Sequence, residues 1–249
     1  GVAACAARGL AAQGSGHAEA FNAALMPRVG DNRDNGNDRS AAKRLLLLPG
    51  SRRSEIRRLV PVMRDAHALL AADSGADGGA DSGVAATLVT VPHLRDEVAA
   101  ALGADSGIEI VSGRDAFYQH LHQADAMMAA SGTVTLQTAL AGVPGVTCYR
   151  TSRLSAMIGR RLVRMDRVIL PNALLRREVY PFLFQEEATP ANLAAHVRAI
   201  FAADQMPGET GSGTARRTAD ELRALLRGGS DDFETLVANA LAPDFGPQD

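Results

Sequence analysis

The residues whose types and spacing best suit chemistry form a short turn, Ser131-Gly132-Thr133, between two apolar segments. The run Ala126–Ala130 before it is typical of a buried strand. Residues 133–141 after it have helical spacing, with Ser131 or Thr133 as a cap. A glycine at such a turn lets backbone approach a ligand, and a helix N-terminus offers free N–H groups and partial positive charge. The turn therefore predicts a phosphate or diphosphate site, although a purely structural turn fits these residues about equally well.

A second junction of the same kind lies near residue 50. The apolar run Leu45–Leu48 predicts a buried strand, the segment Pro49–Arg52 ends it, and apolar residues at helical spacing follow over residues 53–72. Arg52 or Arg53 could meet an anion at this junction. Alternatively, these and the neighbouring arginines form a solvated basic face.

The helix expected over residues 53–72 carries two further signals. Glu55 lies in its first turn, where an acidic side chain interacts favourably with the helix dipole. Pro61 lies within the apolar stripe, so it predicts either a kink or a division into two helices.

Strands and helices alternate along the middle of the chain. Strands are expected at residues 85–92 and 108–111, helices at 94–102 and 115–123, and two more strands within 124–150. This alternation predicts an α/β fold, a Rossmann-like and mostly parallel sheet flanked by helices. Because ligands bind beyond the carboxyl ends of the strands in such sheets, the two turns should converge on one crevice.

The last third of the chain should add one strand and several helices. Residues 168–172 predict a short strand, after which polar side chains are well placed for ligand contacts. Thr189 and Pro190 predict the cap and first position of a helix that runs to about residue 203. Two terminal helices are expected over residues 215–226 and 231–241.

Composition excludes several classes of protein. The 249 residues carry a net charge of −2, which does not favour nucleic acid as a partner. Cys5 and Cys148 are too far apart in sequence for a metal or redox motif, so two buried or free thiols in a reducing compartment are expected. No apolar run is long enough to span a bilayer. Gly1 stands where an initiating Met would be, so we expect the chain to begin inside a longer protein.

The segment from Arg150 to Arg167 contains six arginines and one acidic residue, with apolar residues between them at helical spacing. A basic amphipathic helix of this kind can lie on an anionic membrane surface. An ordinary surface helix with its apolar face in the core is the alternative.

Three segments, taken together and in this order, resemble the lipid-A-disaccharide synthase family of bacterial glycosyltransferases, which have the two-domain GT-B architecture. They are residues 48–56 (LPGSRRSEI), residues 130–150 (ASGTVTLQTALAGVPGVTCYR) and residues 170–185 (LPNALLRREVYPFLFQ). The resemblance covers about residues 45–240 and corresponds to the family's C-terminal half. It implies that residues 43–249 form a nucleotide-sugar-binding domain and that residues 1–42 are a flexible linker or a remnant of a missing N-terminal domain.

The resemblance also implies a reaction, the transfer of 2,3-diacylglucosamine from its UDP donor to 2,3-diacylglucosamine 1-phosphate, which yields lipid A disaccharide 1-phosphate and UDP. No metal or cofactor is expected. The enzyme would be cytoplasmic and peripheral on the inner membrane, which it would contact through Arg150–Arg167, and a homodimer is a candidate assembly. The residues that match the family's UDP-sugar segments are Ser51, Arg52, Ser131, Gly132, Thr133, Gln137, Asn172, Arg177, Glu178 and Gln185.

Among these residues, the turn at 131–133 would face the diphosphate, and Arg177 would grip a phosphate with its two-pronged guanidinium. Gln137 stands where the family usually has a Glu that contacts the ribose hydroxyls, so a charged acceptor is lost. Arg176 and Phe182 also depart from the family pattern.

Nothing in residues 1–44 resembles the family's N-terminal half, which carries the acceptor pocket and the proposed general base. The catalytic residues are therefore expected in that missing half. Two alternatives remain open, another UDP-sugar enzyme of GT-B type and a solitary non-catalytic module that binds a UDP-sugar or a membrane surface.

Overall fold

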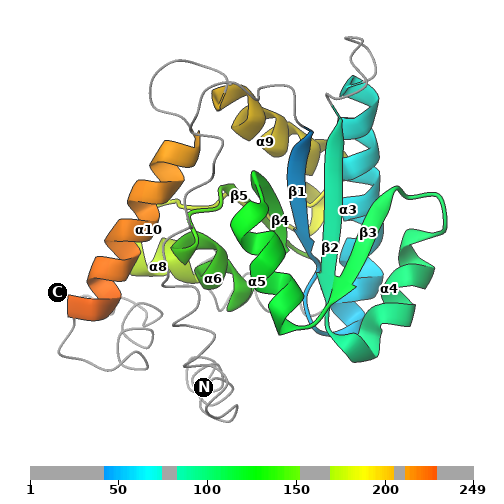
Figure 1. Cartoon of the computed structure of the whole chain (residues 1–249), viewed down its shortest axis with the longest axis horizontal. Helices are drawn as coiled ribbons and strands as arrows, with labels where there is room; N and C mark the ends of the chain where they lie inside the picture. The colour runs from blue at the N-terminus through cyan, green and yellow to red at the C-terminus, as the bar shows by residue number, and fades with distance from the viewer. Residues whose placement is uncertain (1–41, 75–82, 152–168, 205–210, 229–249) are drawn as a thin grey trace, which may run out of the picture.

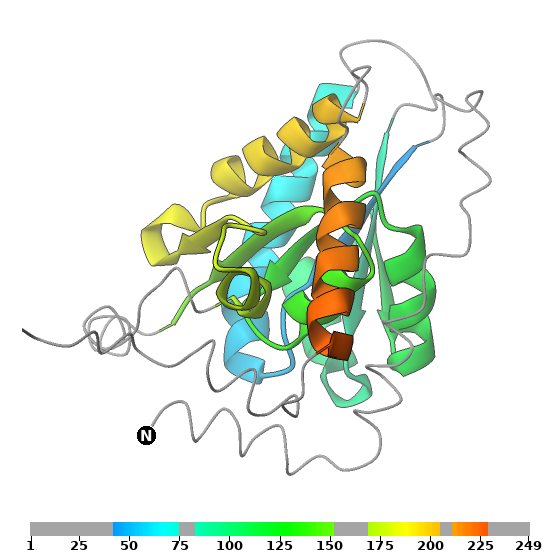
Figure 2. The same ribbon diagram turned by 90° about the vertical axis from the view of Figure 1, so that its left-hand side faces the viewer.

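The computed structural model describes residues 42–74, 83–151, 169–204 and 211–228. Within these residues the chain forms one six-stranded sheet in the order β3-β2-β1-β4-β5-β6, and every neighbouring pair is parallel. Helices cover both faces of the sheet (Figures 1 and 2). The α/β fold with a parallel, Rossmann-like sheet is confirmed.

The strands are β1 (Lys43–Leu48), β2 (Val84–Thr90), β3 (Ile108–Ser112), β4 (Ala126–Ala130), β5 (Gly145–Tyr149) and β6 (Phe182–Phe184). The α-helices are α3 (Arg53–Ser74), α4 (Arg95–Leu102), α5 (Arg114–Gln123), α6 (Val134–Leu140), α8 (Leu170–Leu175), α9 (Pro190–Ala203) and α10 (Gly211–Gly228). Two short 3-10 helices are η2 (Pro92–Leu94) and η4 (Gln185–Glu187).

The run of four leucines in β1 explains why helices pack on both faces. Successive side chains of a strand point to opposite faces, so a continuous apolar run needs cover on both. Leu45 and Leu47 join the core formed with α3, α4 and α9. Leu46 and Leu48 join the second core, formed with α5, α6, α8 and α10.

The strand order reverses between β1 and β4, because β2 and β3 lie on one side of β1 while β5 and β6 lie beyond β4. Such a reversal opens a crevice at the carboxyl ends of the two central strands. Leu48 pairs with Ala129 in the register, so the turn after β1 and the turn after β4 are neighbours at this edge. The two turns therefore lie at the same edge of the sheet, as expected, and a shared crevice stays a prediction.

The strand predicted at residues 168–172 is wrong. Residues 170–175 form the short helix α8, with Pro171 in its first turn, where its fixed φ suits a helix and its missing N–H costs nothing. The sixth strand is β6, which lies beyond it. Its three residues are too few to show a periodic pattern in the sequence.

Pro61 does not divide the helix predicted at residues 53–72. Helix α3 runs from Arg53 to Ser74 with Pro61 inside it. Leu59, Val60 and Met63, on both sides of the proline, are fully buried. Their packing stabilises the helix against the hydrogen bond that proline removes.

Several predictions fall outside the part of the chain that the structure describes. They are the linker or remnant at residues 1–42, of which only residue 42 is described, nearly all of the segment Arg150–Arg167, and the helix at 231–241. The helices over 94–102, 115–123, 189–203 and 215–226 are present within a few residues of their predicted bounds. In the described segments no helix is both long and apolar enough to cross a membrane.

Candidate functional site

The turn after β4 contains backbone N–H groups that are not hydrogen-bonded to the described residues. The Ser131 N–H donates to the Cys148 carbonyl of β5 at 3.1 Å, which anchors the turn to the sheet. Among the described residues, the N–H groups of Gly132, Thr133 and Val134 have no hydrogen-bond partner. Val134 is the first residue of α6, and Gly132 and Thr133 immediately precede it, so these three N–H groups lie at the N-terminal end of the helix, where an anion is favoured.

Neither hydroxyl expected to cap this helix does so. Thr133 occupies the N-cap position of α6, but its side chain accepts no capping hydrogen bond. The Thr135 hydroxyl instead donates to the Gly132 carbonyl at 2.7 Å. The turn is therefore held from inside the helix, and its outer side is left without a side-chain acceptor.

Gly132 is exposed, and a Cβ added there would meet no atom within 4 Å. Its φ lies outside the positive range that favours glycine. The backbone conformation therefore does not require glycine at this position, which has open space in front of it.

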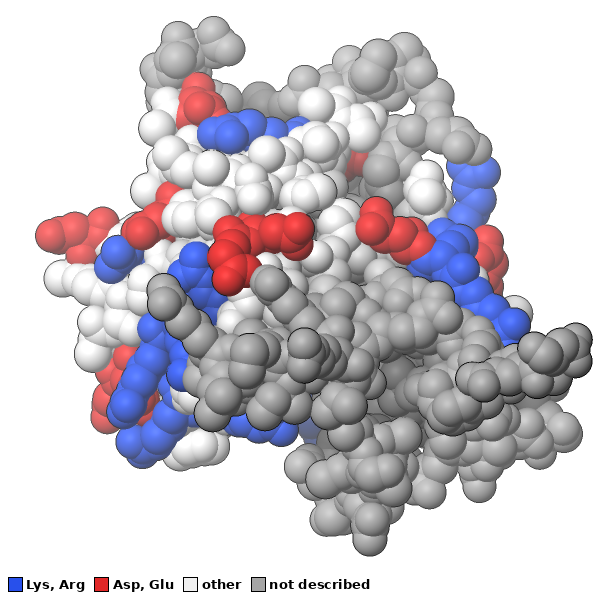
Figure 3. Space-filling model, turned by 180° about the vertical axis from the view of Figure 1, so that it is seen from behind, with Lys and Arg blue, Asp and Glu red and all other residues white. Residues whose placement is uncertain are grey.

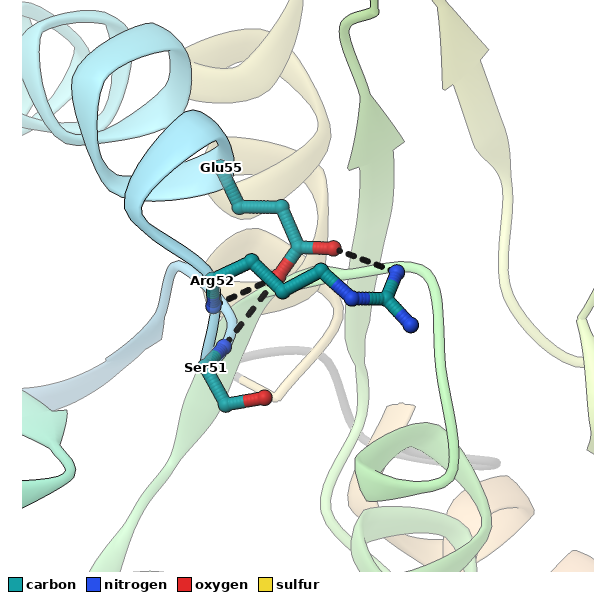
Figure 4. A network of polar contacts seen from close by, with 3 residues as sticks. All are labelled: Ser51, Arg52 and Glu55. Carbon is teal, nitrogen blue, oxygen red and sulfur yellow. Dashed lines mark hydrogen bonds and ion pairs between the residues drawn. The ribbon is translucent and has the colours of Figure 1, made fainter. Parts of the chain in front are cut away.

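The turn after β1 has the opposite arrangement, because a carboxylate of the chain already occupies it (Figure 4). Glu55 Oε2 accepts the N–H groups of Ser51 at 3.1 Å and Arg52 at 3.2 Å. Glu55 Oε1 lies 3.3 Å from Nη1 of Arg52. Two backbone donors that the sequence offered to a phosphate are thus bound internally, while the side chains of Ser51 and Arg52 remain exposed.

The other arginines at the start of α3 form a surface network. Arg53 and Arg57 both pair with Glu97 of α4, at 3.5 and 2.9 Å, and both are about two-thirds exposed. Figure 3 shows basic and acidic side chains together at the lower left, the side of the molecule that carries α3 and α4. For these two residues the solvated basic face is the better description.

Gln137 faces helix α5. Its Nε2 donates to the Tyr118 hydroxyl at 3.4 Å, and the side chain is partly exposed. Burial raises the pKa of Tyr118, with Arg114 opposing the shift, so this hydroxyl stays protonated at neutral pH. The contact between Gln137 and a ribose stays a prediction.

Gln185 lies at the carboxyl end of β6, the same edge as the two turns, but its amide is bound internally. Its Oε1 accepts the Thr151 N–H at 2.8 Å and its Nε2 donates to the Thr151 carbonyl at 3.1 Å. The φ of Gln185 is 52°, a conformation that side chains rarely adopt. Gln185 therefore joins the exits of β5 and β6, and a direct ligand contact would need one of these bonds to open.

Three predicted site residues lie elsewhere. Arg177 and Glu178 line a cavity of about 330 Å³ together with Gly145, the first residue of β5, and Pro181, which precedes β6. These are the amino ends of the strands, at the opposite edge of the sheet from Ser131. The Arg177 guanidinium binds Glu221 at 2.7 Å and Thr218 at 3.1 Å, both on α10.

Asn172 has a structural role in the same region. Its side chain is buried, accepts the N–H groups of Val179 and Tyr180 and donates to the Tyr180 carbonyl. Asn172, Arg177 and Glu178 therefore lie near the amino ends of β5 and β6, and not at the edge that carries Ser131. The expected position depended on a strand at 168–172, and the helix α8 occupies that place.

Two residues were missed as parts of the site, Glu55 as a ligand of the turn and Thr151 as the partner of Gln185. For Glu55 a signal was present in the sequence. An acidic residue three positions after a helix cap often accepts the N–H of the cap residue, as Glu55 does for Arg52. For Thr151 no local signal exists, because its partner is 34 residues away.

The fold and the two turns define a class, the doubly wound parallel α/β domains that present a ligand edge at the reversal of strand order. The family model described as lipid-A-disaccharide synthetase matches residues 26–221, which is most of the chain. The chain belongs to this family.

Named relatives agree. A lipid-A-disaccharide synthase of Rhodopseudomonas palustris (strain BisB18) is 42% identical over 161 residues, and one of Nitrobacter hamburgensis is 40% identical over 157. The matched parts are 64% and 63% of this chain and 38% of each relative, so the chain spans well under half the length of these relatives. A crystal structure of WaaG, a glycosyltransferase involved in lipopolysaccharide biosynthesis, matches 84% of this chain and 48% of that one with a TM-score of 0.47 and 16% identity, a likeness too weak to support a function.

Proposed function

We propose that this chain is the UDP-sugar-binding part of a lipid A glycosyltransferase. The reaction would transfer 2,3-diacylglucosamine from UDP to 2,3-diacylglucosamine 1-phosphate, with release of UDP. Membership of the family supports the reaction. The assignment of the site is carried by the turn at 131–133, beside the reversal of strand order, where three N–H groups have no partner in the part of the chain that the structure describes.

In this proposal the diphosphate binds at the N-terminus of α6, through the N–H groups of Gly132, Thr133 and Val134. The partial positive charge of the helix stabilises the negative charge that develops on departing UDP. The phosphates are also contacted by the side chains of Ser131, Ser51 and Arg52. The side chain of Gln137 contacts the ribose. Gln185 shapes the site by fixing Thr151.

The catalytic residues would come from the part of the enzyme that this chain does not match. The proposal also includes a cytoplasmic enzyme on the surface of the inner membrane, with Arg150–Arg167 as the anionic-lipid contact, and a homodimer as a candidate assembly. These points rest on family resemblance and on the charge pattern of that segment.

The test is calorimetry of UDP binding to the whole chain with substitutions at Gly132. A side chain there meets open space, so Gly132→Asp and Gly132→Asn should both fold normally. Aspartate would place a competing negative charge at the helix N-terminus, and we expect it to weaken UDP binding about a hundredfold, compared with about tenfold for the neutral asparagine of the same shape.

Equal losses for Gly132→Asp and Gly132→Asn would argue against a diphosphate at this turn. If the native chain binds anionic vesicles but not UDP, the alternative of a membrane-surface module is supported instead.

A further inference from the structure

We propose that Glu55 is a positioning residue for the nucleotide-sugar site. Its carboxylate acts as an internal anion that holds the Gly50–Arg52 turn in place, so that the side chains of Ser51 and Arg52 are presented to the diphosphate bound at the neighbouring turn. This inference rests on the proposed function.

The carboxylate is buried and well bound. The Glu55 side chain is only 9% exposed, although the Arg52 side chain that covers it is 75% exposed. One oxygen fixes the backbone at Ser51 and Arg52, and the other contacts the guanidinium of Arg52. A single side chain thus sets both the course of the backbone and the starting position of the cationic group.

Gly50 shows how closely the carboxylate packs on the turn. Its φ is +100°, and a Cβ built there would lie 2.2 Å from Oε2 of Glu55. The carboxylate therefore occupies the space that any other residue at position 50 would need. The absence of a side chain at Gly50 therefore leaves room for the Glu55 carboxylate to lie against the turn.

The location of this turn connects it with the site. The Gly50–Arg52 turn follows β1, and β1 pairs with β4, whose carboxyl end leads into the Ser131 turn. Because Glu55 neutralises the N-terminus of α3, the diphosphate is directed to the N-terminus of α6. Arg52, whose contact to Glu55 is at 3.3 Å and largely in solvent, can exchange that oxygen for a phosphate while the backbone contacts remain.

Calorimetry with UDP and UMP on the whole chain tests the role of Glu55. Glu55→Gln keeps an oxygen for the two N–H groups and removes the charge. We expect UDP affinity to fall about tenfold and UMP affinity to fall less than threefold. UMP lacks the second phosphate, which carries the transferred sugar in the donor, so it has less to lose when Arg52 is misplaced. Glu97→Gln is the matched control, since it removes a carboxylate that also pairs with arginines of α3, and both affinities should stay within about twofold.

A double-mutant cycle separates positioning from general stabilisation. If Glu55 acts mainly through Arg52, the Glu55→Gln change should cost much less UDP affinity in an Arg52→Gln background than in the native chain, with only the part that acts through Ser51 remaining. Equal losses for UDP and UMP, or additive losses in the cycle, would overturn the inference. A native chain that binds no UDP would instead overturn the proposed function, and this inference with it.

A measurement on the native chain needs no substitution. The Arg52 guanidinium NMR signals should move on addition of UDP and much less on addition of UMP. Guanidinium signals that respond equally to both nucleotides would contradict the proposed role.

Discussion

The turns that follow the two central strands are alike in sequence and different in what occupies them. Both follow a buried strand, contain a glycine and lead into a helix, and they are neighbours across the pair β1–β4. In the first, Glu55 occupies two backbone N–H groups. In the second, three N–H groups have no partner among the described residues.

The difference shows that a strand–glycine–helix junction is not by itself an anion site. A helix N-terminus favours negative charge, but the chain can supply that charge itself. The surroundings of the two glycines differ in the same way. Gly50 makes room for an internal carboxylate, whereas Gly132 faces open space. An external anion is expected where the internal one is missing.

The largest difference in stability between the two turns is expected from substitutions of their glycines. Gly50→Ala forces a Cβ against Glu55 at a positive φ, and should destabilise the fold by about 2–3 kcal/mol. Gly132→Ala should change the unfolding free energy by less than about 0.5 kcal/mol. Urea denaturation of both variants measures this. Similar losses at the two positions would remove the distinction between an occupied and an open turn.

A smaller effect is expected from the side chains at the two helix starts. Glu55→Ala leaves the Ser51 and Arg52 N–H groups without their acceptor, and should cost about 1–2 kcal/mol of stability. Thr133→Ala removes a hydroxyl that caps nothing, so its effect should stay within about 0.5 kcal/mol. Thermal unfolding compares the pair. A larger loss for Thr133→Ala would mean that the second turn is capped as well.

The smallest effect concerns Gln137, the proposed ribose contact beside the second turn. Gln137→Glu restores the charged acceptor that the family usually has, and should tighten UDP binding about threefold through charge-assisted hydrogen bonds. Since the ribose is common to both nucleotides, UMP should gain by the same factor. Calorimetry with the two ligands checks this. A gain for one nucleotide alone would place Gln137 near the phosphates instead.

Local patterns were enough for most of the fold. Apolar runs bounded by polar residues located the first five strands, and helical spacing located α3, α5, α9 and α10 within a few residues. These signals extend over four or more residues, so they survive without tertiary context. The strand β6 is too short for such a pattern, and the Pro-Asn segment before it was mistaken for the strand.

The candidate site was only partly predictable. From the sequence one can see that two glycine turns follow strands, and therefore that both lie at the carboxyl edge of a parallel sheet. The sequence does not show which N–H groups are already hydrogen-bonded within the chain, or that Asn172 and Arg177 lie near the opposite edge, because these facts depend on the tertiary structure. A hydrogen-bonding group is available to a ligand only if no other group of the chain reaches it. For Arg177 that depends on Glu221, 44 residues further along the chain.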